Sequence, residues 1–388
     1  MVQGSTATDA RRHSAATATG LVFVAIVLLA FCVNAAVRVP CRDVCGSDLG
    51  RLYETRGIDR DHAPFIDRDL EYPPLVGLVM YAAGVPFDGS LRPSFLLNAL
   101  VLAALAAITT WVLWRAYGSR VRRWVFAPPL LIEGLTNWDL LSVAPATIGL
   151  VQWEAGGAFW VGVLLGIGAT AKLVPTLYVP ILVASCVPFR AWRRVRDLVV
   201  GAALGVGLLA IPVYIAAPDA LDFFLTFHGS RNPTWGTIWF YVLRDPAMHV
   251  WVPVGRLADI GTIITATLVI AAAVVLVVQS ARARLHPLCA CALATVAFIV
   301  ANKVYSPQYD LWLVPFLVMI PARFKLVVHF YASSLLVFVL SAAISHVIDV
   351  PAFLYLMGAA VVYRLVMLVL LARDFVATPV PAPAFVVE

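Results

Sequence analysis

The residues best suited to chemistry are charged side chains that interrupt long apolar stretches. Eight of them come from distant parts of the chain: Asp48, Glu71, Asp139, Lys172, His228, Arg231, Lys303 and Arg364. An ionisable group at membrane depth is unfavourable without a partner, so each one predicts an internal ion pair or a function. Carboxylates suit proton abstraction from a hydroxyl group. The basic side chains suit a phosphate that gains charge as it leaves.

Several other chemistries lack their sequence motifs. The chain has no Walker loop, no GxGxxG element and no HExxH motif, so ATP, dinucleotide and zinc-protease chemistry are not predicted. The six cysteines include no CxxC pair and no Cys/His cluster, so we predict no metal site and no cofactor. Cys41 and Cys45 share a polar loop, where they form either a disulfide facing an oxidising compartment or a pair of free thiols.

The composition is that of a membrane protein. Of the 388 residues, 62% are hydrophobic and only 13% are charged, about half of the roughly 25% found in soluble domains. This excludes an ordinary soluble enzyme and a disordered chain. The net charge of +6 does not indicate nucleic acid binding. Most arginines form short clusters between apolar runs, which is the positive-inside pattern of membrane proteins.

The apolar runs predict an all-α polytopic membrane protein with about twelve transmembrane helices. The expected helices are 18–39, 91–114, 124–137, 138–153, 157–171, 173–188, 197–216, 253–279, 287–302, 308–321, 326–346 and 354–372. With both termini cytoplasmic, the basic clusters at 11–12, 115–123, 190–196, 282–284 and 323–325 all lie inside. Several helices are shorter than the roughly 20 residues that span a bilayer. Their ends must therefore be buried in protein or face water.

The chain is expected to form a single transmembrane domain over 18–372, with cytoplasmic tails at 1–17 and 373–388. Two long outer loops cover 40–90 and 217–252. Within the first loop, 73–87 is too short to span and opens with two prolines, which favours a helix lying at the outer interface. In this topology every candidate residue except Arg364 lies at the outer face. That convergence predicts a site there.

Five segments resemble one known family in the same order along the chain. They are SDLGRLYETRG at 47–57, DRDLEYPPLVGLVMY at 67–81, NWDLLSVAP at 137–145, TAKLVPTLYVP at 170–180 and NKVYSPQYDLWLVP at 302–315. Together they resemble actinobacterial glycosyltransferase family 87 proteins. These are membrane glycosyltransferases of GT-C type, and they include polyprenyl-phosphate-mannose-dependent mannosyltransferases. The last segment is the most distinctive, and the matches cover most of the chain.

The resemblance implies a GT-C fold and an integral membrane hexosyltransferase. A sugar, with mannose as the family-level expectation, would move from a polyprenyl-phosphate donor to a lipid or glycan acceptor. Transfer would take place on the extracytoplasmic face of the cell membrane, with inversion of the anomeric centre. The family places a catalytic acid in the first outer loop. Asp48 stands at that position, and Asp43 is the competing candidate.

The remaining candidates receive expected roles. Lys172, His228, Arg231 and Lys303 are expected to bind the donor phosphate, whereas Glu71, Tyr72, Asp139, Tyr305 and Gln308 are expected to bind substrate. Structural alternatives stay open. Asp48 and Asp139 are also placed to cap helices, and Lys172 is placed to extend its ammonium to the interface. Glu71 has arginines in its own loop to pair with, and Tyr72 is placed to orient the interface helix.

Two other functions fit the same composition. A polytopic lipid or glycolipid transporter would also carry intramembrane charges, but it predicts internal repeats with paired broken helices near the midplane. We find no such repeat, and the polar residues favour one face. A non-catalytic membrane subunit that binds a glycolipid remains an alternative, because a fold does not determine a function.

Overall fold

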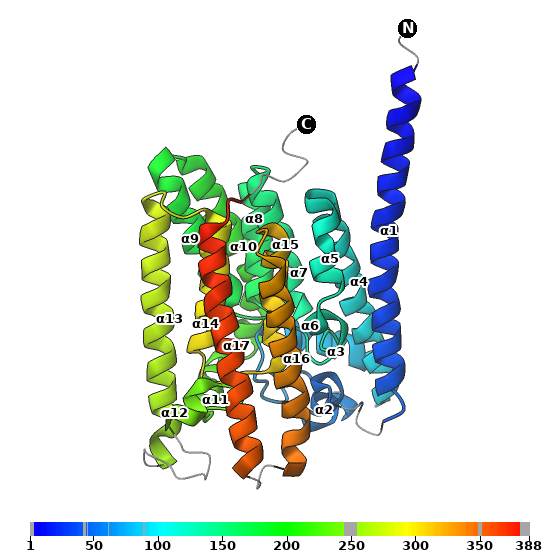
Figure 1. Cartoon of the computed structure of the whole chain (residues 1–388). Coiled ribbons are helices and arrows are strands. Elements are labelled where there is room, and N and C mark those ends of the chain that lie inside the picture. Colours follow the sequence, from blue (N-terminus) through cyan, green and yellow to red (C-terminus); the bar gives the residue numbers. More distant parts are fainter. Residues whose placement is uncertain are drawn as a thin grey trace.

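The computed structural model describes residues 4–380, apart from 42–43, 45, 61, 88–89, 244–253 and 348–350. Over these residues every element is a helix, and the only β pairing is an isolated bridge between Pro64 and Arg68. The helices run mainly along one axis and form a bundle (Figure 1). The predicted all-α polytopic architecture is therefore confirmed.

Six helices in the described part are long and apolar enough to cross a membrane. They are α1 (Gly4–Arg38), α4 (Leu91–Tyr117), α10 (Trp192–Ala216), α13 (Leu257–Ala281), α16 (Phe324–Val347) and α17 (Pro351–Ala377). Large apolar side chains such as Leu208 and Ile270 are more than half exposed on their outer surfaces, as expected of helices that face lipid. α1 begins at Gly4, so the predicted tail at 1–17 continues the first helix over its described part.

The other predicted crossings are shorter helices that extend only part of the way through the bundle (Figure 1). They are α5 (Arg122–Val125), α6 (Pro128–Leu131), α7 (Leu140–Glu154), α8 (Ala158–Ala169), α9 (Tyr178–Cys186), α14 (Pro287–Ala301) and α15 (Val314–Met319). The predicted helix at 124–137 was wrong. It is two single turns, since Ala127 is extended before Pro128, as a residue preceding proline tends to be.

α8 and α10 pack unusually closely. Gly162 and Gly166 of α8 face Gly201 and Gly205 of α10, and a Cβ at any of the four would overlap backbone of the other helix. Small residues allow this approach, which gives van der Waals contact where lipid supplies no hydrophobic driving force. This contact fixes α8, whose lower end leads to Lys172.

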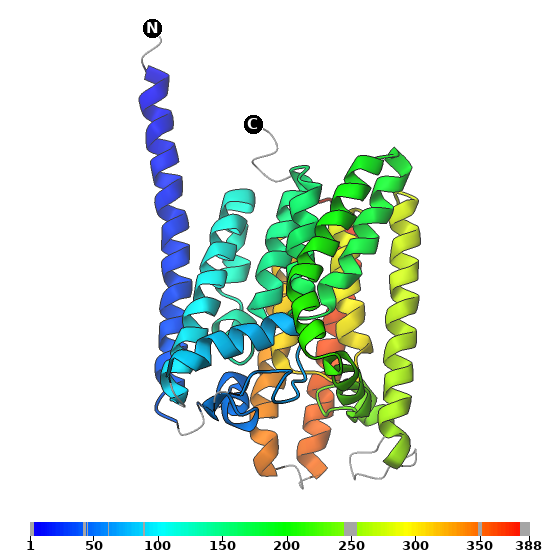
Figure 2. The ribbon, with the colours of Figure 1, turned by 180° about the vertical axis from the view of Figure 1, so that it is seen from behind.

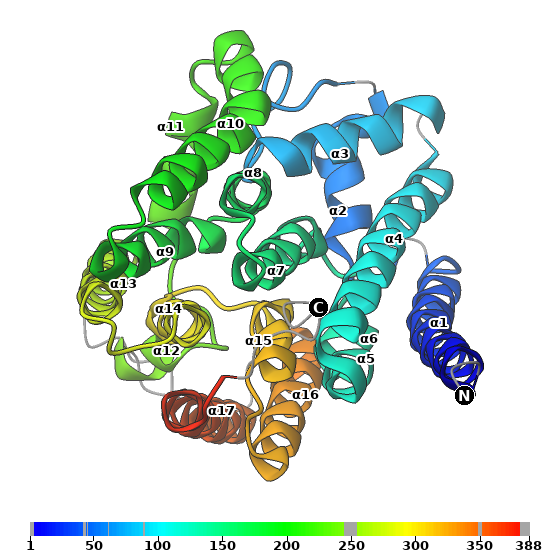
Figure 3. The same cartoon turned by 90° about the horizontal axis from the view of Figure 1, so that it is seen from above.

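A layer of short helices covers the end of the bundle opposite to the start of α1. It contains α2 (Asp48–Thr55), α3 (Pro74–Gly84), α11 (Ala220–Ser230) and α12 (Ile238–Leu243). As predicted for 73–87, α3 lies across the bundle axis (Figures 2 and 3). Its N-terminal turn carries Pro74, which lacks the backbone N–H that a first turn leaves unpaired. The basic clusters that follow α4, α9 and α13 lie at the other end, so we refer to the α2–α3 end as the outer end.

Candidate active site

Asp48 lies at the start of α2 and does not cap it. The cap is Ser47, whose Oγ accepts a hydrogen bond from Leu49 N at 3.2 Å and donates to Leu135 O at 2.7 Å. The backbone N–H of Asp48 donates to Thr136 O at 2.8 Å. These bonds tie the start of α2 to the loop before α7 and leave the Asp48 carboxylate free to face the centre of the outer end.

The Asp48 carboxylate accepts hydrogen bonds from three side chains. Asn137 Nδ2 donates to Oδ2 at 2.7 Å, and Tyr72 OH donates to the same oxygen at 3.3 Å. Arg51 Nη2 donates to Oδ1 at 2.7 Å, but its side chain is 67% exposed. The Asp48 side chain keeps 22% of its surface exposed, so it remains accessible to a substrate.

Asn137 connects the carboxylate to a cation. Its Oδ1 accepts from Trp138 N at 2.7 Å and from Lys172 Nζ at 3.2 Å, while its Nδ2 also donates to Tyr72 OH at 2.5 Å. Every polar position of the amide is therefore used. This fixes its orientation, with the oxygen toward Lys172 and the nitrogen toward Asp48.

The loop that carries Asn137 is held by α1. Asn34 Nδ2 donates to Leu131 O and Ile132 O at 2.9 Å each. Arg38 donates to Ile132 O and to Thr136 Oγ1 at 3.2 and 3.1 Å. Backbone groups of a non-helical segment inside a membrane protein need such partners, because lipid offers none. The polar end of α1 thereby positions the site.

Lys172 and Asp139 form the second charged pair. Lys172 Nζ lies 3.6 Å from Asp139 Oδ1, and these side chains are 12% and 2% exposed. Trp312 Nε1 donates to the same oxygen at 2.8 Å. Lys172 Nζ also lies 4.6 Å from the centre of the Tyr72 ring, a cation–π distance. Asp139 makes no side-chain capping bond to α7, so its contacts identify it as an ion-pair partner.

His228 and Glu71 lie beside this cluster. The Nε2 of His228 lies 3.0 Å from Glu71 O, so it donates to that carbonyl. Glu71 in turn pairs with Arg56, with Nη2 and Oε2 at 2.6 Å. The Glu71 carboxylate is thus engaged within its own loop, the structural alternative left open by the sequence, and its backbone holds His228.

Arg231 and Lys303 differ in their freedom to bind a ligand. The Arg231 guanidinium lies 5.9 Å from the Phe227 ring, and no carboxylate pairs with it among the described residues.

Lys303 Nζ donates to Gly229 O at 2.7 Å, Ala258 O at 3.1 Å and Thr262 Oγ1 at 2.6 Å. All three of its N–H donors are used by protein. Lys303 therefore holds the C-terminal end of α11, and a phosphate would have to displace one of these bonds.

Tyr305 and Gln308 lie in the turn before α15, and both are buried. Tyr305 OH donates to Asp310 Oδ2 at 2.9 Å and lies 3.3 Å from Pro307 O. Its hydroxyl is engaged with its own turn, which makes it a poor contact for a sugar. Gln308 belongs to η7 (Pro307–Trp312), the same 3-10 helix that presents Trp312 to Asp139.

Burial sets the protonation of two groups in the outer layer. Burial, followed by the Asp48 charge, raises the pKa of Tyr72 well above its usual range, so the phenol stays a donor. Burial also lowers the pKa of His228, which the hydrogen bond to Glu71 opposes and the Arg231 and Lys172 charges reinforce. His228 is therefore neutral at pH 7.

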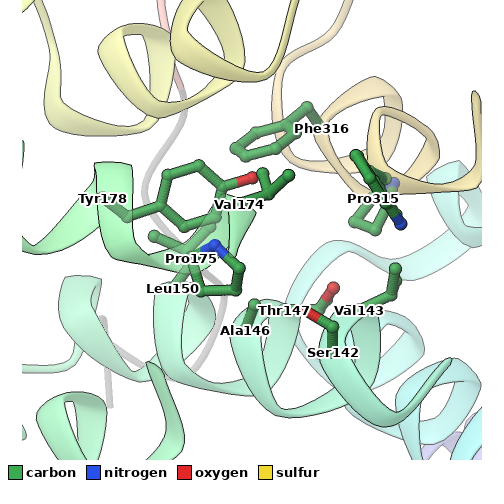
Figure 4. A pocket seen from close by; sticks show the side chains of 11 residues that line it. Ser142, Val143, Ala146, Thr147, Leu150, Val174, Pro175, Tyr178, Pro315 and Phe316 are labelled. Carbon is green, nitrogen blue, oxygen red and sulfur yellow. The ribbon is translucent and has the colours of Figure 1, made fainter. Parts of the chain in front are cut away.

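A small apolar cavity adjoins the cluster on the bundle side. α7 contributes Ser142, Val143, Ala146, Thr147 and Leu150; Val174, Pro175 and Tyr178 come from η4 (Val174–Leu177) and α9; Trp312, Pro315 and Phe316 close it (Figure 4). Trp312 belongs to both places, since its ring lines the cavity and its N–H donates to Asp139. The cavity measures about 20 Å³, which is room for about one water molecule.

Over the described residues, no group of three or more His, Cys, Asp or Glu side chains is placed to hold a metal ion. Cys41 is disulfide-bonded, whereas Cys32, Cys186, Cys289 and Cys291 are free. Cys45 and Asp43, the competing base, lie outside the described residues.

The structure brings Asp48, Tyr72, Asp139 and Lys172 together and places His228 beside them. Burial raises the pKa of Tyr309, which the charges of Asp139 and Asp48 reinforce and the charge of Arg231 opposes. Sequence reasoning missed Asn137, Trp312 and the supporting pair Asn34 and Arg38. These residues could have been found in the sequence as polar or indole side chains inside apolar runs, as in Asn137-Trp138-Asp139. The arrangement combines a reachable carboxylate with cations at the outer end of a membrane bundle.

Comparison with known proteins gives matches only among solved structures. No protein family profile matches the chain, and no curated protein matches it in sequence. It is similar to ArnT from Cupriavidus metallidurans bound to undecaprenyl phosphate, with 15% identity over 93% of this chain and 78% of that chain and a TM-score of 0.49. The apo state of ArnT gives the same identity and coverage and a TM-score of 0.47.

Proposed function

We propose that the protein is an integral membrane glycosyltransferase of GT-C type. It transfers a sugar, which the family resemblance suggests is mannose, from a polyprenyl-phosphate donor to a lipid or glycan acceptor on the extracytoplasmic face. The observation that carries the proposal is the Asn137 amide, which joins the reachable Asp48 carboxylate to the Lys172 ammonium. A base and a phosphate-binding cation are thereby held in one rigid unit.

Asp48 is assigned as the general base. Its carboxylate takes the proton of the acceptor hydroxyl while that oxygen bonds to the anomeric carbon. Asn137 and Tyr72 fix its orientation through their hydrogen bonds. Positioned proton transfer of this kind contributes about 10²–10⁴ in rate.

Lys172 and Arg231 are assigned to the departing phosphate. The bond between the anomeric carbon and the phosphate oxygen breaks, and the phosphate leaves with one more negative charge. Lys172 and Arg231, which no carboxylate pairs with among the described residues, stabilise that charge. A single displacement inverts the anomeric centre, so a β-linked mannosyl donor gives an α-mannoside. The transition state has oxocarbenium character, as in glycoside hydrolysis.

The lipid part of the donor is assigned to the membrane beside the bundle, where the spanning helices expose large apolar side chains such as Leu208 and Ile270. The cavity behind Trp312 has a volume of about 20 Å³, which is room for about one water molecule. It is therefore too small for the carrier chain.

The test uses purified protein in lipid with radiolabelled polyprenyl-phosphate-mannose and a membrane glycolipid extract. Wild type should transfer label, and Asp48→Asn should lower transfer by about 10²-fold or more. Glu54→Gln is the matched control, because Glu54 is an exposed carboxylate on the same helix. Full activity of Asp48→Asn would refute the base assignment. Absence of both donor binding and transfer with every polyprenyl-phosphate sugar would refute the proposed function.

A further inference from the structure

Arg364 is a buried charge in the middle of a spanning helix. It lies in α17, and only 4% of the residue is exposed. An arginine inside a membrane helix needs strong partners, because lipid cannot solvate its charge. The expected outer-face site does not include it, so its contacts indicate what it does.

The guanidinium contacts two separate outer segments at once, 232–237 and 302–312. Its central carbon lies 3.4 Å from the centre of the Tyr305 ring, which is a stacked arrangement. Nη2 donates to Gly236 O at 3.2 Å, and Nη1 lies 3.9 Å from Asp310 Oδ1. Asp310 closes the unit by accepting from Tyr305 OH. A planar guanidinium can make all of these contacts, whereas an ammonium cannot.

The two segments are also bonded to each other. Thr234 N donates to Lys303 O at 3.0 Å, and Tyr305 N donates to Thr234 Oγ1 at 3.0 Å. The packing leaves no space for a larger residue, since a Cβ at Gly236 would lie 2.6 Å from the Tyr305 ring. One segment follows Arg231 directly, and the other continues through Asp310 to Trp312.

We propose that Arg364 is a positioning residue for the site. It does not contact substrate. It fixes the turn after Arg231 and the 3-10 helix that presents Trp312 to Asp139, and it thereby sets the distance between the phosphate-binding groups. The kinetic test of this inference rests on the proposed function, because it measures the KM for the donor. A second test measures local structure by hydrogen exchange and does not depend on that function.

The experiment compares Arg364→Lys, Arg364→Met and the double variant Arg364→Met/Asp310→Asn in lipid. Arg364→Met alone leaves Asp310 as a buried unpaired charge and is expected to lower the thermal midpoint. The double variant removes both charges and should regain the midpoint. It should still show a donor KM at least tenfold higher, with a smaller change in kcat, and Arg364→Lys should not restore the wild-type KM. Arg373→Met is the control, since Arg373 is an exposed cation on the same helix.

Hydrogen exchange of segments 232–237 and 302–312 gives the independent measurement. Both segments should exchange faster in the double variant than in wild type, even if wild type transfers no sugar from any donor tested. That combination would support the positioning role while refuting the proposed function. Unchanged exchange, or a double variant with wild-type KM and kcat, would overturn the positioning role.

Discussion

The side-chain amide of Asn137 donates a 2.7 Å hydrogen bond to the carboxylate of Asp48, which lies 89 residues earlier in the chain. The oxygen of the same amide accepts from Lys172. One uncharged side chain thus separates an acid from a cation and holds both in place. If the acid and the cation contacted each other directly, each would be less available to a substrate.

Asn137→Asp should shift the pH dependence of transfer. The new carboxylate faces Asp48 where an N–H donor stood, and two neighbouring carboxylates raise the pKa of one of them. The pair would then lose its proton only at higher pH, so the acidic limb of the pH–rate profile should shift to higher pH. Rates from pH 5 to 9 test this. An unshifted limb would contradict the assignment of Asp48 as the base.

Lys172→Met should weaken donor binding and stability together. Asp139 would be left as a buried carboxylate with Trp312 as its remaining partner, and breaking a buried ion pair costs about 3–5 kcal/mol. The double variant Lys172→Met/Asp139→Asn should recover the thermal midpoint but keep a donor KM raised at least tenfold. Recovery of donor affinity in the double variant would remove Lys172 from the phosphate site.

His228 should make stability depend on pH. Its ordinary pKa is 6.5, and burial lowers the pKa in the folded protein. Between these two values the unfolded chain binds more protons, so the stabilisation is complete above about pH 6.5 and is lost as the pH falls through the folded pKa. The slope is at most about 1.4 kcal/mol per pH unit.

His228→Gln keeps an N–H donor for Glu71 O and removes the titration. Thermal midpoints of both proteins at pH 5 and pH 7.5 give the comparison. Wild type should lose more stability than the variant at the lower pH. Equal losses would show that His228 is not responsible.

Gly205→Ala should disrupt the contact between α8 and α10. The added Cβ would overlap backbone of Val163, and overpacking of this kind costs about 1–3 kcal/mol. Gly207→Ala is the matched control, two residues further along α10, where a Cβ would meet only the flexible end of Ile211. Thermal midpoints in detergent should fall for the first variant and stay unchanged for the second. A similar midpoint for both would contradict the close packing.

The sequence predicted the helical bundle well, because apolar runs and arginine clusters depend on local composition. It placed helix 73–87 across the outer end from two prolines and a short length. It could not predict the break at Ala127, where two one-turn helices replace a longer one. It also could not show that Lys303 uses all its donors on Gly229, Ala258 and Thr262, since those partners come from other helices.

The sequence also could not predict the role of Asn137. Neutral amides are common at helix junctions, and nothing in the local pattern separates a cap from a bridge between distant side chains. Arg364 was visible as a charge in an apolar run, but its partners Tyr305, Asp310 and Gly236 lie far from it in the chain. Long-range pairs of this kind follow from tertiary packing.

In two fully described stretches, 118–191 and 282–323, the short helices between spanning helices occur in even numbers. Four short segments, counting α5 and α6 as one, separate α4 from α10, and two separate α13 from α16. The chain therefore enters and exits each group of short helices at the same end of the bundle (Figure 1). The six long helices therefore alternate in direction on their own. During biogenesis they can insert first and establish the orientation of the whole chain, and the short segments, which are too short to be stable alone in lipid, can fold between them afterwards.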